Sequence, residues 1–331
     1  MTDYRRALEE AVRFLREHDR FLILSHVNPD GDAIGSTLAV AAMLEQLGKS
    51  YVLVNESGAP DKFSFLPRFE RICNLSQDLA GDTFSAVIAV DCADASRMGD
   101  VRQLFAPDAA LLNIDHHPTN DAFGAVNVIR TDAAATAEIL YDLNEAAGLP
   151  ITEDFALCIY TGLLTDTGGF RYSNTSPYNM EIAARLLRYG VNPGDVAERC
   201  LEVITLSHVK LLRQALQTLR MSHGNLVASV FVSRQDLESA GADREDAGGL
   251  VNYCRNIEGV EVGVSFVEAE PGTVKVSLRA RSCVDVSEIA KQLGGGGHAK
   301  AAGCTLRGTL AEAQERVWNA LGQALGVNAD E

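Results

Sequence analysis

Short apolar segments in the first 115 residues alternate with helical patterns, and most of these segments end at a polar or charged residue. The apolar segments are RFLILS (20–25), YVLVN (51–55), SAVIAVD (85–91) and ALLNID (110–115). Residues 33–49, 133–148 and 152–166 show the apolar spacing of helices. Strands that alternate with helices predict an α/β fold with a doubly wound, mostly parallel sheet. Ligands of such sheets bind outside the carboxyl ends of the strands, so we expect the functional site at this edge.

The pattern changes after residue 222 and predicts a second, smaller α/β domain. Residues 177–221 have the pattern of several helices, and the last of these, LSHVKLLRQALQTLRM (206–221), is expected to connect two domains. Further on, residues 225–233 predict a strand, 245–257 a helix and 260–281 a hairpin around Pro271-Gly272, followed by helices that begin after Asp285 and Thr309. We therefore place a first domain at 1–200, a linker helix at 201–222 and the second domain at 223–331.

Composition restricts where the protein works and what it binds. The chain has 45 Asp and Glu against 29 Lys and Arg, a formal net charge of −16, so long nucleic acid would be repelled unless cations reverse the charge locally. No segment approaches the roughly 18 to 20 apolar residues that span a bilayer. The N-terminus MTDYRRALEEAVRFLREHDR lacks the apolar region of a signal peptide. Seven scattered cysteines without a C-x-x-C pair indicate reduced thiols, so we predict a cytoplasmic protein with no membrane partner.

Carboxylates and imidazoles gather at the predicted strand ends and in the turns beside them. These side chains come from SHVNPDGDAIGS (25–36), from the segment ends at 91 and 115–117, and from LLTDTGG (163–169). They are His26, Asp30, Asp32, Asp91, Asp115, His116, His117 and Asp166. Any one of these aspartates has a simpler explanation as a turn residue or helix cap. Several carboxylates in one cleft, however, would raise one another's pKa unless cations lay between them.

The chemistry of these side chains predicts the type of cation. Oxygen ligands with one or two imidazoles suit Mn²⁺ or Mg²⁺, and the histidines favour Mn²⁺. Tetrahedral zinc would take fewer carboxylates. Two ions about 3.5–4 Å apart share a carboxylate and activate water for attack on phosphorus.

Five motifs resemble those of one known family. SHVNPDGDAIGS, VDCAD, IDHH and TGLLTDTGGFRY resemble the four motifs of the DHH phosphoesterase superfamily, and GGGGHAKAAG (294–303) resembles the signature of its DHH-associated C-terminal domain. The resemblance covers nearly the whole chain and is greatest to oligoribonucleases that also dephosphorylate pAp. It implies two divalent ions, Mn²⁺ first with Mg²⁺ or Co²⁺ as alternatives, held by His26, Asp30, Asp32, Asp91, His116 and Asp166.

The resemblance also implies a role for each residue. Asp91 is expected to bridge the ions, with His26 and Asp30 on one ion and Asp32, His116 and Asp166 on the other. As catalytic residues, Asp115 is expected to support an imidazole and His117 to contact the scissile phosphate.

The glycine run has its own physical explanation. Consecutive glycines let backbone N–H groups approach an anion closely, whereas a helix C-cap needs one glycine only. The resemblance implies that Arg255, Arg279 and His298 bind the substrate's far phosphate, and Gly295, Gly296 and Gly297 are predicted to bind substrate with them. For Arg281 and Lys300, a solvated role and a substrate contact are equally supported.

These expectations combine into a cytoplasmic hydrolase that clamps a nucleotide between its two domains. The predicted activity is Mn²⁺-dependent hydrolysis of short oligonucleotides such as pApA to mononucleotides, and removal of the 3′ phosphate of pAp is allowed. One alternative is a cyclic-di-AMP phosphodiesterase. The other is a nucleotide-sensing module without turnover, and the complete set of predicted metal ligands argues against this second alternative. The predicted partners are short oligonucleotides or dinucleotides and no long duplex, and a homodimer is allowed.

Overall fold

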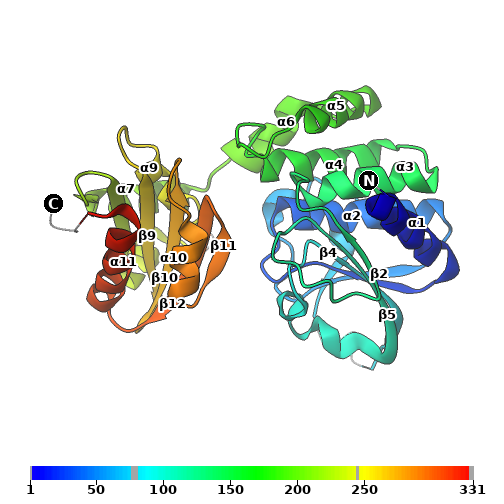
Figure 1. The fold of residues 1–331 in the computed structure, drawn as a ribbon, viewed down its shortest axis with the longest axis horizontal. Helices are drawn as coiled ribbons and strands as arrows, with labels where there is room; N and C mark the ends of the chain where they lie inside the picture. Colours follow the sequence, from blue (N-terminus) through cyan, green and yellow to red (C-terminus); the bar gives the residue numbers. More distant parts are fainter. Residues whose placement is uncertain (1, 76–80, 244–245, 328–331) are drawn as a thin grey trace. The chain divides into compact units, whose positions relative to one another are not determined.

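The computed structural model describes residues 2–75, 81–243 and 246–327 (Figure 1). The chain divides into two compact units, Met1–Val203 and Ile204–Glu331. Each unit consists of a six-stranded sheet covered by helices, so the predicted α/β architecture with a second, smaller domain is confirmed. In the described part of the chain, no helix is long and apolar enough to cross a membrane.

The sheet of the first unit is parallel throughout its strand pairings. Its strands are β1 (Phe21–Leu24), β2 (Tyr51–Asn55), β3 (Ile72–Asn74), β4 (Phe84–Val90), β5 (Phe105–Asp115) and β6 (Val126–Ile129). They lie in the order β3-β2-β1-β4-β5-β6, and each neighbouring pair is parallel. The chain therefore extends the sheet from β1 in one direction and then, from β4, in the other. In a doubly wound sheet this switch point, between β1 and β4, is where ligands bind.

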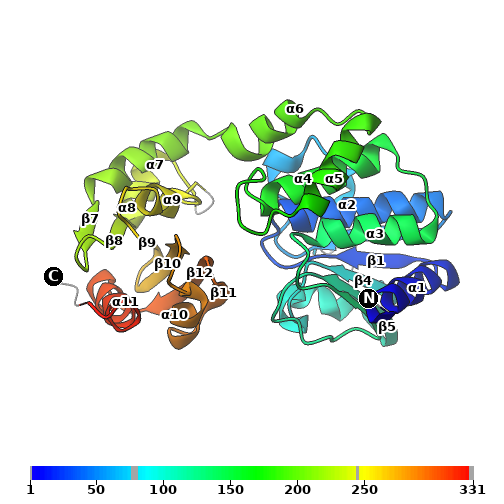
Figure 2. The same cartoon turned by 45° about the horizontal axis from the view of Figure 1, so that its top comes forward.

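Both faces of this sheet are covered, which explains why its strands are continuous apolar runs. The helices are α1 (Thr2–Glu17), α2 (Gly31–Gln46), α3 (Thr136–Ala147), α4 (Glu153–Asp166), α5 (Pro177–Leu186) and α6 (Pro193–Ala197). Helices α2, α3 and α4 contact one another over one face (Figures 1 and 2). Phe21 and Ile23 of β1 pack into the core on this side. Leu22 and Leu24 pack on the opposite face, with the 3₁₀ segment Ala95–Leu104.

Close packing of α2 against α4 brings two acidic residues together. A Cβ on Gly35 of α2 would lie 2.6 Å from the Cys158 carbonyl oxygen of α4, and a Cβ on Gly162 of α4 would lie 2.6 Å from Oδ1 of Asp32. Only glycine permits such an approach of two helices at both positions. As a result, the start of α2 and the end of α4 place Asp32 and Asp166 beside the same sheet edge.

The second unit has a mixed sheet of different topology. Its strands are β7 (Arg220–Ser222), β8 (Val227–Val232), β9 (Val262–Glu270), β10 (Thr273–Ala280), β11 (Gly296–His298) and β12 (Ala301–Arg307). The order is β11-β12-β10-β9-β8-β7, and only the β8–β9 pairing is parallel among these described strands. Its helices are α7 (Leu206–Gln217), α8 (Arg234–Ala240), α9 (Leu250–Arg255), α10 (Val286–Gln292) and α11 (Leu310–Leu325). Helices α7, α8 and α9 cover one face, and α10 and α11 cover the other (Figure 2).

Most local predictions for the second unit are confirmed, but two helices are shorter than predicted. The hairpin around Pro271-Gly272 is β9–β10, and Asp285 and Thr309 cap α10 and α11. The helix predicted to continue to Met221 ends at Gln217, because the Thr218 hydroxyl oxygen accepts from the Phe231 N–H of β8 at 2.7 Å and the chain then joins the sheet as β7. The helix predicted over 245–257 extends over Leu250–Arg255 only, because residues 246–249 form turns; its predicted first residue, Glu245, lies outside the described residues.

Candidate metal centre and substrate-binding residues

Asp91 occupies the centre of the carboxyl edge of the first sheet. It follows β4, which lies between β1 and β5, and its N–H donates to the Ile114 carbonyl oxygen at 3.0 Å. Its side chain is buried and its φ is +59°, in the left-handed region that non-glycine residues rarely adopt. Such backbone strain persists where the surrounding structure holds it, and it concentrates at functional sites.

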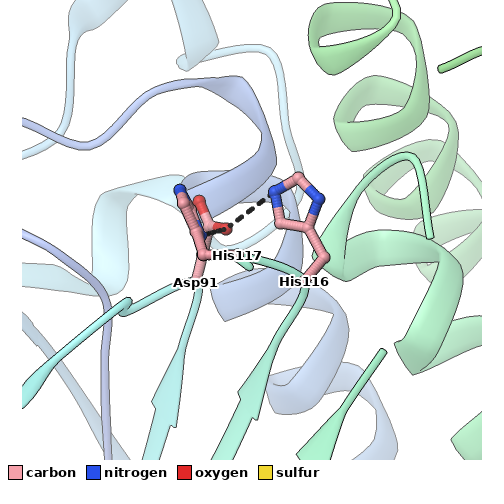
Figure 3. Close-up of side chains that lie close together, drawn as sticks. All are labelled: Asp91, His116 and His117. Carbon is pink, nitrogen blue, oxygen red and sulfur yellow. Dashed lines mark ion pairs between the residues drawn. The ribbon is translucent and has the colours of Figure 1, made fainter. Parts of the chain in front are cut away.

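Three imidazoles surround the Asp91 carboxylate. Nε2 of His26 lies 3.4 Å from Oδ2. Nε2 of His116 and Nδ1 of His117 lie 3.6 and 3.7 Å from Oδ1, and Figure 3 shows these two imidazoles beside Asp91. Burial alone would raise the pKa of Asp91, but the hydrogen bond with His26 and the charges of the three imidazoles outweigh it and hold the pKa below its usual range. Asp91 is therefore a carboxylate that stays ionised although it is buried.

Main-chain carbonyl groups orient two of these imidazoles. Nδ1 of His26 lies 2.8 Å from the Val27 carbonyl oxygen, and Nδ1 of His116 lies 3.3 Å from the Ala133 carbonyl oxygen. Because a carbonyl oxygen only accepts, Nδ1 carries the proton that it donates and Nε2 faces the carboxylates. Histidines that bind metal ions are usually held in this way by their other ring nitrogen.

The structure brings all the predicted ligand residues together. Three groups have ligand atoms within 4.8 Å of one another: His26, Asp30 and Asp91; Asp32, His116 and Asp166; and Asp91, His116 and His117. Asp91 belongs to the first and third groups, and His116 to the second and third. Asp91 and His116 thus connect the three groups into one continuous cluster.

The electrostatics of this cluster fit bound cations. Burial, followed by the charges of neighbouring carboxylates, raises the pKa of Asp32 and of Asp166 well above the usual value. Within the described residues, no lysine or arginine forms an ion pair with Asp30, Asp32, Asp91 or Asp166. Acidic groups that have no lysine or arginine partner from the chain are where a divalent ion would supply the missing charge.

His117 is held by a hydrogen-bond network of which the sequence predicts Asp115, as the support of an imidazole, but not Asn120. Its Nδ1 lies 2.8 Å from Oδ1 of Asp115, which is fully buried. Oδ2 of Asp115 accepts from Nδ2 of Asn120 at 2.6 Å, and the same amide donates to the Cys92 carbonyl oxygen at 2.9 Å. Burial would lower the pKa of His117, but the bond to Asp115 and the charges of Asp91 and Asp115 raise it to about 9. The only sequence signal for Asn120 is its place in the turn after the DHH motif.

Comparisons with known proteins identify the family. The model of the DHH family, N-terminal domain, matches residues 20–163, and the DHHA1 domain model matches residues 211–326. A Thermus thermophilus protein named bifunctional oligoribonuclease and PAP phosphatase NrnA is 39% identical over 305 residues, which are 92% of this chain and 89% of the relative. The chain belongs to the DHH family.

Further relatives of this DHH-family protein extend over most of its length. A Bacillus subtilis protein with the same name is 29% identical and covers 90% of this chain and 92% of its own. The crystal structure of an exopolyphosphatase-related protein from Bacteroides fragilis matches with a TM-score of 0.90 at 24% identity, covering 97% of both chains. This structural likeness shows that the two proteins share the fold.

In the DHHA1 part of the chain, the predicted phosphate-binding residues share one face of the second sheet. Arg279 and His298 both pair with Ala301 of β12, from its two sides, and directly paired residues project to the same face of a sheet. Arg279 also pairs with Gly263, where a Cβ would lie 2.5 Å from the backbone nitrogen of Arg255. Helix α9, which ends at Arg255, thus packs on the face that carries Arg279 and His298.

The glycine run of this DHHA1 domain has several structural roles. Gly294 has a φ of +83° after α10, and the Gly295 N–H donates to the Ala290 carbonyl oxygen at 2.8 Å. A Cβ on Gly295 would lie 2.1 Å from the Gly303 carbonyl oxygen, whereas a Cβ on Gly296 would meet nothing within 4 Å. The start of the run therefore ends a helix and packs against β12, and the N–H of Gly295 is used inside the protein.

The exposed side chains of Arg281 and Lys300 also make contacts within the second unit. Arg281 donates to the carbonyl oxygens of Arg255 and Ile257, at 3.1 Å each. Lys300 donates to the carbonyl oxygen of Ser282 and, at 3.4 Å, to that of Val284. Both side chains connect loops of the second unit, so neither is simply solvated.

Proposed function

We propose that this DHH-family protein is a metal-dependent phosphoesterase that hydrolyses short oligonucleotides to mononucleotides and also removes the 3′ phosphate of pAp. The observation that carries the proposal is the position of Asp91, a buried carboxylate that adjoins three imidazoles and, together with His116, connects the ligand groups into one cluster. The relatives named oligoribonuclease and PAP phosphatase support the same substrate class, rather than a cyclic dinucleotide.

In this proposal the chain holds two divalent ions, of which Mn²⁺ is the expected one. His26, Asp30 and Asp91 would hold one ion, and Asp32, His116 and Asp166 the other, with Asp91 shared. When bound, such ions supply Lewis acidity and activate water for attack on phosphorus. The histidine ligands support Mn²⁺ over Mg²⁺, since imidazole suits transition metals better.

The chain's own contribution beside the ions comes from His117 and Asp115. Asp115 engages Nδ1 of His117 and so fixes the ring, which means that contact with the scissile phosphate would be made through Nε2. The burial of Asp115 keeps this hydrogen bond away from water. A cationic imidazole held in one orientation can stabilise charge that develops on phosphoryl oxygens.

The second unit is proposed to bind the rest of the substrate. Arg255, Arg279 and His298 would bind a phosphate distant from the cleaved bond, with Gly295, Gly296 and Gly297 beside them. Their shared sheet face supports this role. The functional division would then be a DHH phosphoesterase domain before α7 and a substrate-binding domain after it.

The remaining features of the proposal concern the state of the protein in the cell. We place it in the cytoplasm, because all seven cysteines are free thiols. A homodimer is the proposed assembly, and sedimentation of the purified protein tests it.

The proposed function is tested with two adenine nucleotides. Purified protein is incubated with Mn²⁺ and either pApA or pAp, and AMP and inorganic phosphate are measured by chromatography. We expect AMP from both substrates, phosphate from pAp only, and no product after EDTA treatment. Turnover of cyclic-di-AMP but not of pApA would support the cyclic-dinucleotide alternative, and binding without turnover would support a nucleotide sensor.

A further inference from the structure

Thr136 contacts two of the proposed metal ligands at once. It is the first residue of α3 and is fully buried. Its hydroxyl donates to Oδ1 of Asp91 at 2.9 Å, and its backbone N–H donates to Oδ2 of Asp32 at 2.6 Å. Thr136 therefore fixes the distance between the carboxylates of Asp91, which is proposed to be shared by the ions, and Asp32, which belongs to one ligand group.

Asp32 also takes the place of a helix cap for α3. Ala135 is the N-cap residue and makes no side-chain capping bond, whereas Oδ1 of Asp32 accepts from the Ala137 N–H at 3.0 Å and from the Ser36 hydroxyl at 3.2 Å. With the Thr136 N–H on Oδ2, Asp32 accepts from two backbone donors at the positive end of the helix, which favours a negative charge. The side chain of Asp32 is thereby held in one orientation.

The Thr136 hydroxyl has the same effect on Asp91. A hydroxyl has one proton to donate, and in this structure it is directed to Oδ1 of Asp91, the oxygen that also adjoins His116 and His117. Loss of a donor that orients a ligating carboxylate typically weakens metal binding by about 10–100-fold. Because Asp91 and Thr136 are both buried, water cannot replace this donor without entering the core.

We infer that Thr136 is a positioning residue of the metal centre, and that its hydroxyl holds the Asp91 carboxylate in the orientation that two ions share. This inference rests on the proposed two-metal site. It differs from a packing role in one respect: positioning needs the hydroxyl, whereas packing needs the methyl group.

Two substitutions separate these roles. Thr136→Val keeps the shape and removes the hydroxyl, and Thr136→Ser keeps the hydroxyl and removes the methyl group. Both leave the backbone N–H on Asp32. Thr37→Val is the matched control, because Thr37 is also buried but donates its hydroxyl to the Ala33 carbonyl oxygen at 2.8 Å.

The measurement is Mn²⁺ binding to the full chain, with no substrate present. Equilibrium dialysis gives the number of ions and their affinities, and electron paramagnetic resonance detects the spin coupling between ions that share a carboxylate. We expect Thr136→Val to weaken Mn²⁺ binding by about 10–100-fold and to lose the coupled signal, with Thr136→Ser and Thr37→Val within about threefold of wild type.

The possible results distinguish this inference from the proposed function. If the wild type binds two coupled Mn²⁺ ions and Thr136→Val does the same, or if Thr136→Ser is as weak as Thr136→Val, the inference is wrong while the metal site stands. If the wild type binds no Mn²⁺ and does not hydrolyse pApA, the proposed function itself fails. Circular dichroism checks folding, and Thr136→Ala replaces Thr136→Val if the valine variant does not fold.

Discussion

The buried side chain of Asp115 and the partly buried side chain of His117 form a hydrogen bond of 2.8 Å, from Nδ1 of the imidazole to Oδ1 of the carboxylate. The carboxylate is itself fixed, since its second oxygen accepts from Asn120. The orientation of His117 thus depends on a residue that the solvent does not reach. This dependence makes Asp115 testable separately from the proposed metal ligands.

Asp115→Asn should lower kcat by about 10–100-fold on pApA, because an amide in place of the carboxylate no longer favours one ring orientation or the charged imidazole. Mn²⁺ affinity should change much less, since Asp115 is not among the proposed ligands. Steady-state kinetics and Mn²⁺ dialysis measure the two effects. Asp121→Asn, an exposed neighbour in the same loop, is the control. A normal kcat in Asp115→Asn would mean that His117 needs no support from this carboxylate.

Asp91→Ala should abolish turnover, because the variant lacks the shared carboxylate that is proposed to fix the spacing of the ions. EDTA should have the same effect on the wild type, and Mn²⁺ should restore activity better than Mg²⁺. Rates of AMP release from pApA measure both expectations. Wild-type rates in Asp91→Ala would exclude the two-metal assignment, and a clear preference for Mg²⁺ or Zn²⁺ would contradict the interpretation of the ligand set.

The metal-ligand candidates could be predicted from the sequence because a parallel sheet brings its strand ends together. Asp91 and His116 follow adjacent strands, and His26 follows the strand on the other side of Asp91, so their proximity follows from the α/β pattern alone. The residues that orient the cluster could not be predicted in this way. Thr136 and Asp32 are 104 positions apart along the chain, and they form a hydrogen bond only because the helices that carry them pack together.

His298→Ala and Arg279→Ala should impair hydrolysis of pApA while sparing the chemistry. Both side chains are proposed to bind a distant phosphate, and loss of remote binding energy affects both KM and kcat. Bis-p-nitrophenyl phosphate has no distant phosphate, so both variants should cleave it about as well as the wild type does. Equal losses on the two substrates would instead assign these residues to the fold or to the metal centre.

Glu261 should make the stability of the second unit depend on pH in the acid range. Burial would raise its pKa, but hydrogen bonds from the N–H and hydroxyl of Ser282 and from the N–H groups of Val284 and Cys283 lower it from 4.5 to about 2. A carboxylate with a lowered pKa stabilises the folded state above its unfolded pKa, and this contribution is lost as the pH falls from 4.5 towards 2.

The experiment compares urea unfolding of the wild type, Glu261→Gln and the exposed control Glu258→Gln. Trp318 is the one tryptophan of the chain and packs on Phe266, so its fluorescence follows the second unit. Glu261→Gln should be less stable than the wild type at pH 7, and the difference should shrink below pH 4.5. A difference that stays constant with pH would contradict this account of Glu261.

The boundaries of several elements depended on contacts that the sequence does not encode locally. Strands β3 (ICN) and β6 (VNVI) are short and include an asparagine, so they lack the continuous apolar pattern of β1, and they form because a neighbouring strand offers an edge. The residues LQTLRM continue the helical pattern of α7, yet the Thr218 contact with β8 ends the helix first. Tertiary contacts outweigh local propensity at such positions.

The central claim, that short oligonucleotides are the substrates, is tested most directly by kcat/KM on 5′-phosphorylated oligomers of increasing length at two salt concentrations. The net charge of −16 would repel a long strand outside the metal centre, and salt would relieve this repulsion. We predict that kcat/KM falls steadily from two to about five nucleotides and that long single strands and duplexes are poor substrates. Processive degradation of a long strand that salt weakens would contradict the account.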